Sequence, residues 1–222
     1  MSIFRRRGRD EPEQKPAEAD QAQPASAEDG EPADKASRSH GPYDSAEVDL
    51  EELRADRIDI GGLLIRRVEG MQVQLQVDEK TGRPASVMVV LGDAAVQLIP
   101  VAAPRSSGLW DQTRLQIAAD AQRRGGTAEE AAGPFGTEIR IVLPVTTQEG
   151  KKGVQPSRIA GIDGPRWMLR ATFLGAATNN ADAFGRLVQI VRDTVVVRGD
   201  NPMPPGELIP LRPPQQPSAE EA

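Results

Sequence analysis

The segment Asp163-Gly164-Pro165-Arg166-Trp167, followed by Arg170, holds the side chains in this sequence that are best suited to recognition. Arg166 beside Trp167 places a fixed cation next to a large aromatic ring, a combination that grips acidic groups or phosphates at protein surfaces. The same residues are also typical of a hairpin turn, with Trp167 in the core and Arg166 and Arg170 facing solvent. We favour the turn and keep the segment as a candidate interaction surface.

Arginines elsewhere in the sequence could extend this segment into a basic patch on an otherwise acidic protein, whose net charge is −6. The four that could share one surface are Arg105, Arg166, Arg170 and Arg198. Such a patch would suit an acidic protein or a small anion, although exposed arginines on strands need no ligand. Our candidate interaction surface comprises Arg105, Asp163, Arg166, Trp167 and Arg170.

Carboxylates are available for acid–base or metal chemistry, but their spacing does not bring them together. The candidates are Glu69, Asp78, Glu79, Asp93, Glu138 and Asp163. A metal ion needs several converging oxygen ligands, and a phosphate loop needs a glycine spacing that is not found here. We therefore interpret these residues as charged turn residues, predict no metal and no cofactor, and assign no catalytic residue.

Composition excludes further classes of site. The 222 residues contain no cysteine and a single histidine, His40, so disulfides, thiolate metal sites, cysteine nucleophiles and paired imidazoles are excluded. The acidic balance argues against general affinity for nucleic acid, which requires a basic face. No apolar run approaches the roughly 20 residues of a membrane-spanning helix. We predict a cytoplasmic protein that has a protein partner, binds no nucleic acid and does not insert stably into a membrane.

The chain divides into four parts by composition. We predict a disordered acidic, proline-containing tail over 1–44, an acidic linker or short helix over 45–57, a single domain over 58–200, and a proline-rich tail over 201–222. Within the last part, the apolar residues Leu208, Ile209 and Leu211 would allow 206–211 to lie across the domain.

Hydrophobic periodicity indicates the elements that would position the candidate surface. Alternating or buried apolar runs predict strands at 58–68, 71–77, 86–91, 95–101, 137–145, 157–162 and 166–174. Helical spacing predicts helices at 109–124 and 183–193, and a capping-box pattern predicts a brief helix from Thr127 that ends before Gly133. Short hairpin turns require antiparallel neighbours. The fold class is therefore α+β, with an antiparallel sheet packed by two main helices.

Three strings of residues resemble a known family. They are Ala102–Ser106 with Leu109-Trp110, Gly161–Arg170, and Val195–Gly199 with Pro202–Pro204. Together they resemble a domain-of-unknown-function family found in high-GC Gram-positive bacteria, over about residues 57–212. That resemblance implies no particular activity. The order of elements is also similar to that of Mog1/PsbP-like domains, which act as binding adaptors, and this similarity is one of fold alone.

Our leading hypothesis is a non-catalytic protein-binding or scaffolding domain, because a well-patterned body carries few nucleophiles, bases or metal ligands. One alternative is an enzyme that acts on a phosphorylated or nucleotide substrate, and it requires Asp163 or Glu138 to converge with Arg166 or Arg170 in one pocket. A second alternative is a peripheral membrane protein held by the basic segment 3–9.

Overall fold

The computed structural model describes residues 40–106, 108–146 and 150–214. The chain divides into two compact units, 1–31 and 32–222, and all of the described residues belong to the second. The segment 3–9, residues 1–39 of the predicted N-terminal tail and residues 215–222 of the predicted C-terminal tail therefore lie outside the described residues. Across the described ranges, no helix is both long and apolar enough to cross a membrane.

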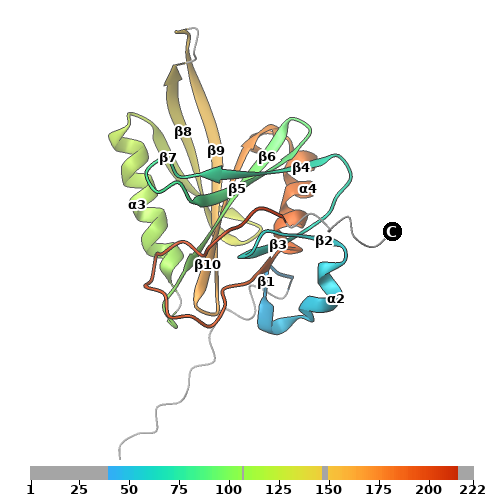
Figure 1. Cartoon of the computed structure of the whole chain (residues 1–222). Helices are drawn as coiled ribbons and strands as arrows, with labels where there is room; N and C mark the ends of the chain where they lie inside the picture. The colour runs from blue at the N-terminus through green and yellow to red at the C-terminus, as the bar shows by residue number, and fades with distance from the viewer. Residues whose placement is uncertain (1–39, 107, 147–149, 215–222) are drawn as a thin grey trace, which may run out of the picture. The chain divides into compact units, whose positions relative to one another are not determined.

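A large antiparallel sheet forms the centre of this unit (Figure 1). Its strands, in spatial order, are β4 (Met71–Val77), β5 (Pro84–Leu91), β6 (Ala94–Ala102), β10 (Trp167–Gly175), β9 (Lys152–Gly164), β8 (Gly136–Thr146) and β7 (Thr127–Gly133). Every neighbouring pair is antiparallel, as the predicted hairpins require. The alternating sequence of β4 and the apolar run of β5 are both strands, so these predictions are confirmed.

A second, smaller sheet packs beside the first and was not predicted. Its strands, in order, are β1 (Tyr43–Asp44), β11 (Val195–Val196), β3 (Leu63–Arg66) and β2 (Arg57–Asp59), and β1 runs parallel to β11. Short helices η1 (Ser45–Glu47) and α2 (Leu50–Arg54) connect β1 to β2. Residues 40–57 are thus part of the folded structure, because the first strand pairs with the last.

The proline-rich segment after β11 joins the two sheets. The amide of Ile209 donates to the carbonyl of Pro100 in β6, and the amide of Arg212 donates to the carbonyl of Ile60 beside β3. The side chains of Ile209 and Leu211 are buried. The body of the protein therefore extends beyond residue 200, and the apolar residues within this segment anchor it.

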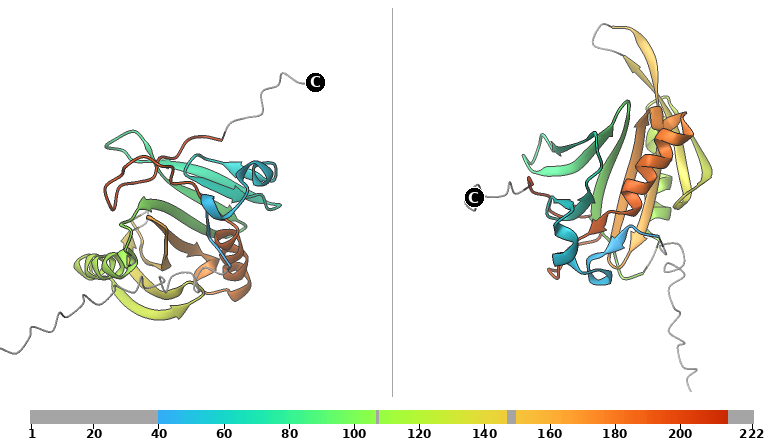
Figure 2. Two further views of the ribbon diagram at one scale, coloured as in Figure 1. Left: turned by 90° about the horizontal axis from the view of Figure 1, so that it is seen from below. Right: turned by 90° about the vertical axis from the view of Figure 1, so that its right-hand side faces the viewer.

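The two faces of the large sheet carry different helices (Figure 2). On one face, Leu169 and Phe173 of β10 pack with helix α4 (Ala181–Arg192) and with Leu63 of the small sheet. Asn180 caps α4 by accepting from the amides of residues 182 and 183, and this helix has the strong amphipathic pattern that predicted it. This face contains the main hydrophobic core.

On the opposite face, helix α3 (Leu109–Arg123) lies over strands β7, β8 and β9. Trp110 anchors it, since its ring lies directly on Gly161 of β9 and its indole nitrogen donates to the carbonyl of Thr137 at 2.7 Å. A Cβ atom at Gly161 would lie only 2.2 Å from the Trp110 ring, so glycine is needed for this contact. The helix therefore covers one side of this face.

A buried ion cluster ties β8 and β9 together on the α4 face. The carboxylate of Glu138, which is 1% exposed, accepts from Arg158 at 2.9 and 3.0 Å and from Arg140 at 3.0 Å. The guanidinium of Arg158 also lies 3.5 Å from the ring centroid of Phe184 on α4. A Cβ atom at Gly133 would lie 2.4 Å from Glu138 Oε2, so Gly133 provides the space for this carboxylate.

Two local predictions are wrong. Residues 127–133 form the strand β7 and not a brief helix, because their backbone pairs with β8 along its whole length. The turn between β9 and β10 consists of Pro165 and Arg166, and not of Asp163 and Gly164, which still belong to β9.

Candidate functional site

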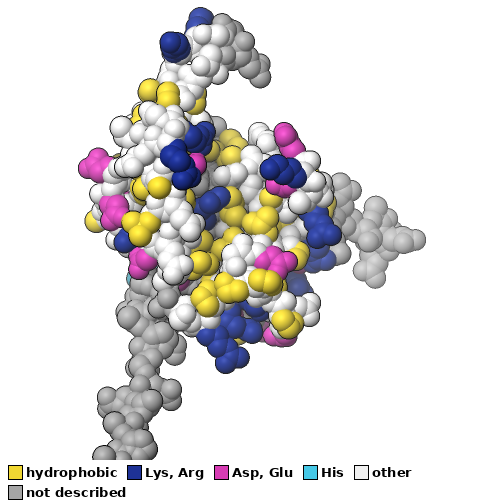
Figure 3. All heavy atoms as spheres, turned by 90° about the vertical axis from the view of Figure 1, so that its left-hand side faces the viewer, with side chains coloured by type: hydrophobic (Ala, Val, Ile, Leu, Met, Phe, Trp, Pro, Cys, Tyr) yellow, Lys and Arg dark blue, Asp and Glu magenta, His cyan; other side chains and the backbone are white. Residues whose placement is uncertain are grey.

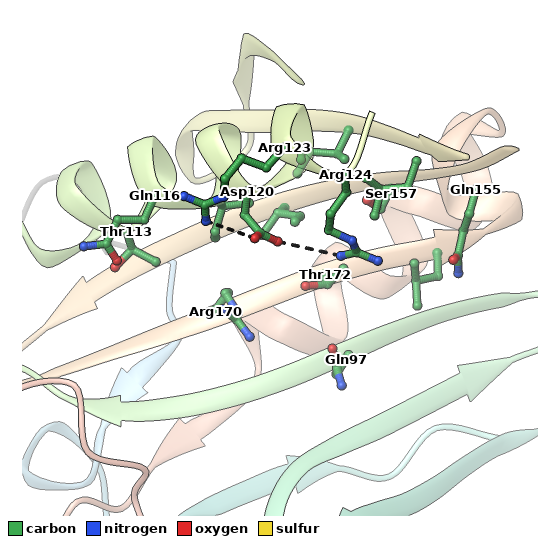
Figure 4. Close-up of a pocket in the computed structure, with 16 residues that line it drawn as sticks. Gln97, Thr113, Gln116, Asp120, Arg123, Arg124, Gln155, Ser157, Arg170 and Thr172 are labelled. Atoms are coloured by element: carbon green, nitrogen blue, oxygen red, sulfur yellow. Dashed lines mark hydrogen bonds and ion pairs between the residues drawn. The ribbon is translucent and has the colours of Figure 1, made fainter. Parts of the chain in front are cut away.

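A groove runs between helix α3 and the part of the large sheet that α3 leaves uncovered (Figure 4). Its volume is about 650 Å³. We call it the α3 groove. The helix contributes Thr113, Gln116, Ile117, Asp120, Ala121, Arg123 and Arg124, and the sheet contributes Gln97, Ile141, Leu143, Gln155, Ser157, Ile159, Arg170, Thr172 and Leu174.

A second hollow of about 330 Å³ adjoins the α3 groove and shares Thr113, Gln116 and Arg170 with it. Gly206 and Leu208 of the proline-rich segment form part of its wall. The two hollows therefore meet at Arg170. Figure 3 views the molecule from the side of α3, where basic and hydrophobic side chains lie close together.

Arg170 is placed on the floor of the groove by the alternation of β10. Its neighbours Leu169 and Ala171 point into the main core, so Arg170 must point to the α3 side. The side chain is half-buried, and its Nε atom is buried without a hydrogen-bond partner among the described residues. Burial lowers the pKa of the Arg170 guanidinium, because desolvation disfavours the charged form. An arginine nonetheless stays protonated at neutral pH.

Three charged side chains at the C-terminal end of α3, of which Arg124 is the C-cap residue, lie on the other side of the groove (Figure 4). Asp120 pairs with Arg123 at 3.1 Å and with Arg124 at 3.8 Å. All three are more than half exposed, so these ion pairs contribute little to stability and can exchange for others. The charged lining of the groove thus consists of three arginines and one carboxylate, which leaves a positive balance.

The structure separates the residues of the predicted interaction surface. Trp167 is fully buried on the α4 face, where its indole nitrogen donates to Asp44 Oδ2 at 2.6 Å. Arg105 is exposed on the loop before α3. Arg166 lies in the turn between β9 and β10, and its backbone carbonyl accepts a hydrogen bond from the amide of Ala103 on the same loop as Arg105. Of the predicted surface residues, only Arg170 lines the α3 groove.

The enzyme alternative requires Asp163 or Glu138 to meet Arg166 or Arg170 in one pocket, and neither carboxylate lies in the two described hollows that contain Arg170. Asp163 Oδ2 accepts from the amide of Gly108 at 3.2 Å and faces the first turn of α3. Glu138 points to the opposite face of the sheet and pairs with Arg158. Neither lines the α3 groove or the adjoining hollow. Over residues 40–106, 108–146 and 150–214, no group of three or more His, Cys, Asp or Glu side chains is arranged to hold a metal ion.

The sequence reasoning missed the residues of α3 that face the groove. Thr113, Gln116 and Asp120 recur at intervals of three or four residues, which places them on one helical face. This polar stripe lies beside the apolar stripe that predicted the helix. This polar stripe is the sequence feature from which a groove along this side of α3 could have been predicted.

The turn residue Arg166 has φ = 61°, a left-handed conformation that side chains with a Cβ atom adopt at a cost. We therefore expect Arg166→Gly to be more stable than Arg166→Ala by about 1 kcal/mol, the reverse of the usual order of these residues. Urea unfolding of the two variants measures the difference. A more stable alanine variant would show that the turn tolerates the Cβ atom without strain.

A sequence model of the family described as "Protein of unknown function (DUF3710)" matches residues 41–220. The chain belongs to this family. The DUF3710 match includes both sheets, α3 and every residue of the α3 groove. It confirms the expected membership of a domain-of-unknown-function family.

No curated protein matches the DUF3710 chain. Among solved structures, the solution structure of cyanobacterial PsbP from Synechocystis sp. PCC 6803 is similar to it, with 11% sequence identity and a TM-score of 0.34. The similar region covers 61% of this chain and 87% of that chain.

Proposed function

We propose that this DUF3710 domain is a non-catalytic, cytoplasmic protein-binding domain, and that the α3 groove receives a segment of its partner. The observation that carries the proposal is the groove of about 650 Å³, which has a half-buried arginine on its floor. Burial of an arginine without a full set of partners is costly. A partner that supplies hydrogen bonds to Arg170 would offset that cost.

The lining of the groove supports the binding of a polypeptide. Apolar side chains such as Ile141, Leu143 and Ile159 alternate with hydroxyl and amide groups such as Gln116 and Thr172. Amide and hydroxyl side chains both donate and accept hydrogen bonds, as peptide groups do. Apolar side chains of a partner segment can be buried between them.

Site-specific photo-crosslinking in the native cell tests the proposal. A photoreactive amino acid at Gln116 or Gln155, both exposed at the groove, should give a discrete cross-linked product with a partner protein. The photoreactive amino acid placed instead at position 129 or 182 serves as the control, because Glu129 and Asp182 are exposed and lie outside the groove. Equal cross-linking from groove and control positions, or none from the groove, would overturn the proposal.

A further inference from the structure

We infer that the α3 groove recognises an extended acidic segment of its partner, with a carboxylate of that segment paired to the guanidinium of Arg170. This inference rests on the proposed function and names the chemistry of the partner. The first observation that supports this inference is the net positive charge of the groove. Arg123, Arg124 and Arg170 face a single carboxylate, Asp120, so an added acid is attracted and not repelled.

Arg170 is suited to be the fixed anchor of that carboxylate. Its strand is held on both sides, since Arg170 pairs in register with Ile99 of β6 and with Gly161 of β9. Its Nε atom lacks a hydrogen-bond partner among the described residues, and the fork of an arginine binds a carboxylate through two parallel hydrogen bonds. Partial exclusion of water strengthens such a pair relative to one in solvent.

Arg123 and Arg124 provide a second, adjustable contact. Within the described part of the chain both pair with Asp120 alone, and these pairs are exposed, so either guanidinium can turn to a ligand at little cost. Figure 4 shows them on the helix, across the groove from Arg170 on β10. A segment bound between the helix and the strand can therefore present acidic side chains to both walls.

The length and lining of the groove favour a peptide over a free phosphate. The helix side of the groove runs from Thr113 to Arg124, about 17 Å, a distance that about five residues of extended chain span. A phosphate is satisfied by donors alone, whereas Gln97, Gln155 and Ser157 in the lining also accept hydrogen bonds. The apolar residues between them have no use in phosphate binding.

Binding of synthetic peptides to the full chain tests the inference. Fluorescence anisotropy compares a labelled peptide of about eight residues that alternates glutamate with small residues against the same peptide with glutamine at each glutamate position. We expect the glutamate peptide to bind at least about tenfold more tightly, and this preference to weaken as salt is added. Equal affinity of the two peptides would overturn the inference.

Matched arginine variants locate the binding site. Arg170→Gln should weaken binding of the glutamate peptide at least about tenfold, because one charged hydrogen-bonded partner is lost. Arg186→Gln on the exposed face of α4 makes the same change in net charge and should leave the affinity unaltered. Thermal unfolding of both variants checks that the fold is retained. Equal losses in the two variants would point to charge alone and would overturn the inference.

Two further results separate this inference from the proposed function. Stronger competition by inorganic phosphate than by free glutamate would overturn the acidic-peptide assignment in favour of a phosphate ligand. Cross-links that come from the groove, together with indifference to peptide charge, would overturn the inference and leave the protein-binding function standing. Absence of both the cross-links and the peptide binding would overturn both.

Discussion

Glu138→Ala is expected to destabilise the protein by about 3 kcal/mol, because it breaks a buried ion cluster by removing one partner. The carboxylate is 1% exposed and holds Arg158, which is itself 17% exposed. Its removal leaves a largely buried guanidinium without its counter-charge. Chemical denaturation followed by circular dichroism measures the change. The exposed carboxylate Glu69, in the turn before β4, provides the control, and Glu69→Ala should change stability by no more than about 0.5 kcal/mol.

A double variant distinguishes loss of the ion pair from loss of packing. Glu138→Leu combined with Arg158→Met replaces both charges by apolar groups and should recover stability to within about 1 kcal/mol of the parent. Arg140, which is half exposed, can then turn to solvent. If Glu138→Ala alone lowered the free energy of unfolding by less than about 1 kcal/mol, the cluster would contribute no more to stability than an exposed ion pair does.

Gly161→Ala is expected to cost about 2–3 kcal/mol, because the new methyl group would overlap the ring of Trp110. The backbone of β9 is fixed by its pairing with β10, so the ring must move and α3 must move with it. Urea unfolding gives the stability, and a change in tryptophan fluorescence that is absent when Trp110 is replaced by Phe reports the displacement of this ring. The α3 groove should also change shape, so the acidic peptide should bind more weakly.

Gly185→Ala is the matched control for this substitution. Gly185 lies within α4, and no atom lies within 4 Å of the position that its Cβ would occupy. Alanine is a better helix former than glycine, so this variant should be more stable by about 0.5–1 kcal/mol. If the two substitutions had similar effects, the contact between Trp110 and Gly161 would not be what holds α3 in place.

The strands and long helices could be predicted from the sequence because their periodicity reflects burial directly. The alternation of apolar and polar residues in β4 is typical of a strand, and the apolar stripe of α4 is typical of an amphipathic helix. The segment 127–133 was mispredicted because alanine and glutamate favour a helix locally, whereas pairing with β8 decided the outcome. The small sheet was missed because β1 and β11 have only two residues each and pair across most of the chain.

The candidate site was predicted only in part. Arg170 was identified, but on a solvent-exposed strand face, because nothing in its own sequence context shows that α3 lies over that side of the sheet. The sequence allowed Trp167 to lie either at the surface or in the core. In the structure it is buried and hydrogen-bonded to Asp44, which is 123 residues away in the sequence. Contacts of such long separation depend on topology, which no local pattern encodes.

The odd and even positions of strand β10 face opposite sides of the large sheet. Leu169, Ala171 and Phe173 are fully buried in the main core, whereas Arg170 and Thr172 line the groove. The groove-facing positions can therefore be exchanged without disturbing the residues that keep the domain folded. A library randomised at these two positions and at Thr113 and Gln116 of α3 would show whether the proposed binding specificity can be changed without loss of stability.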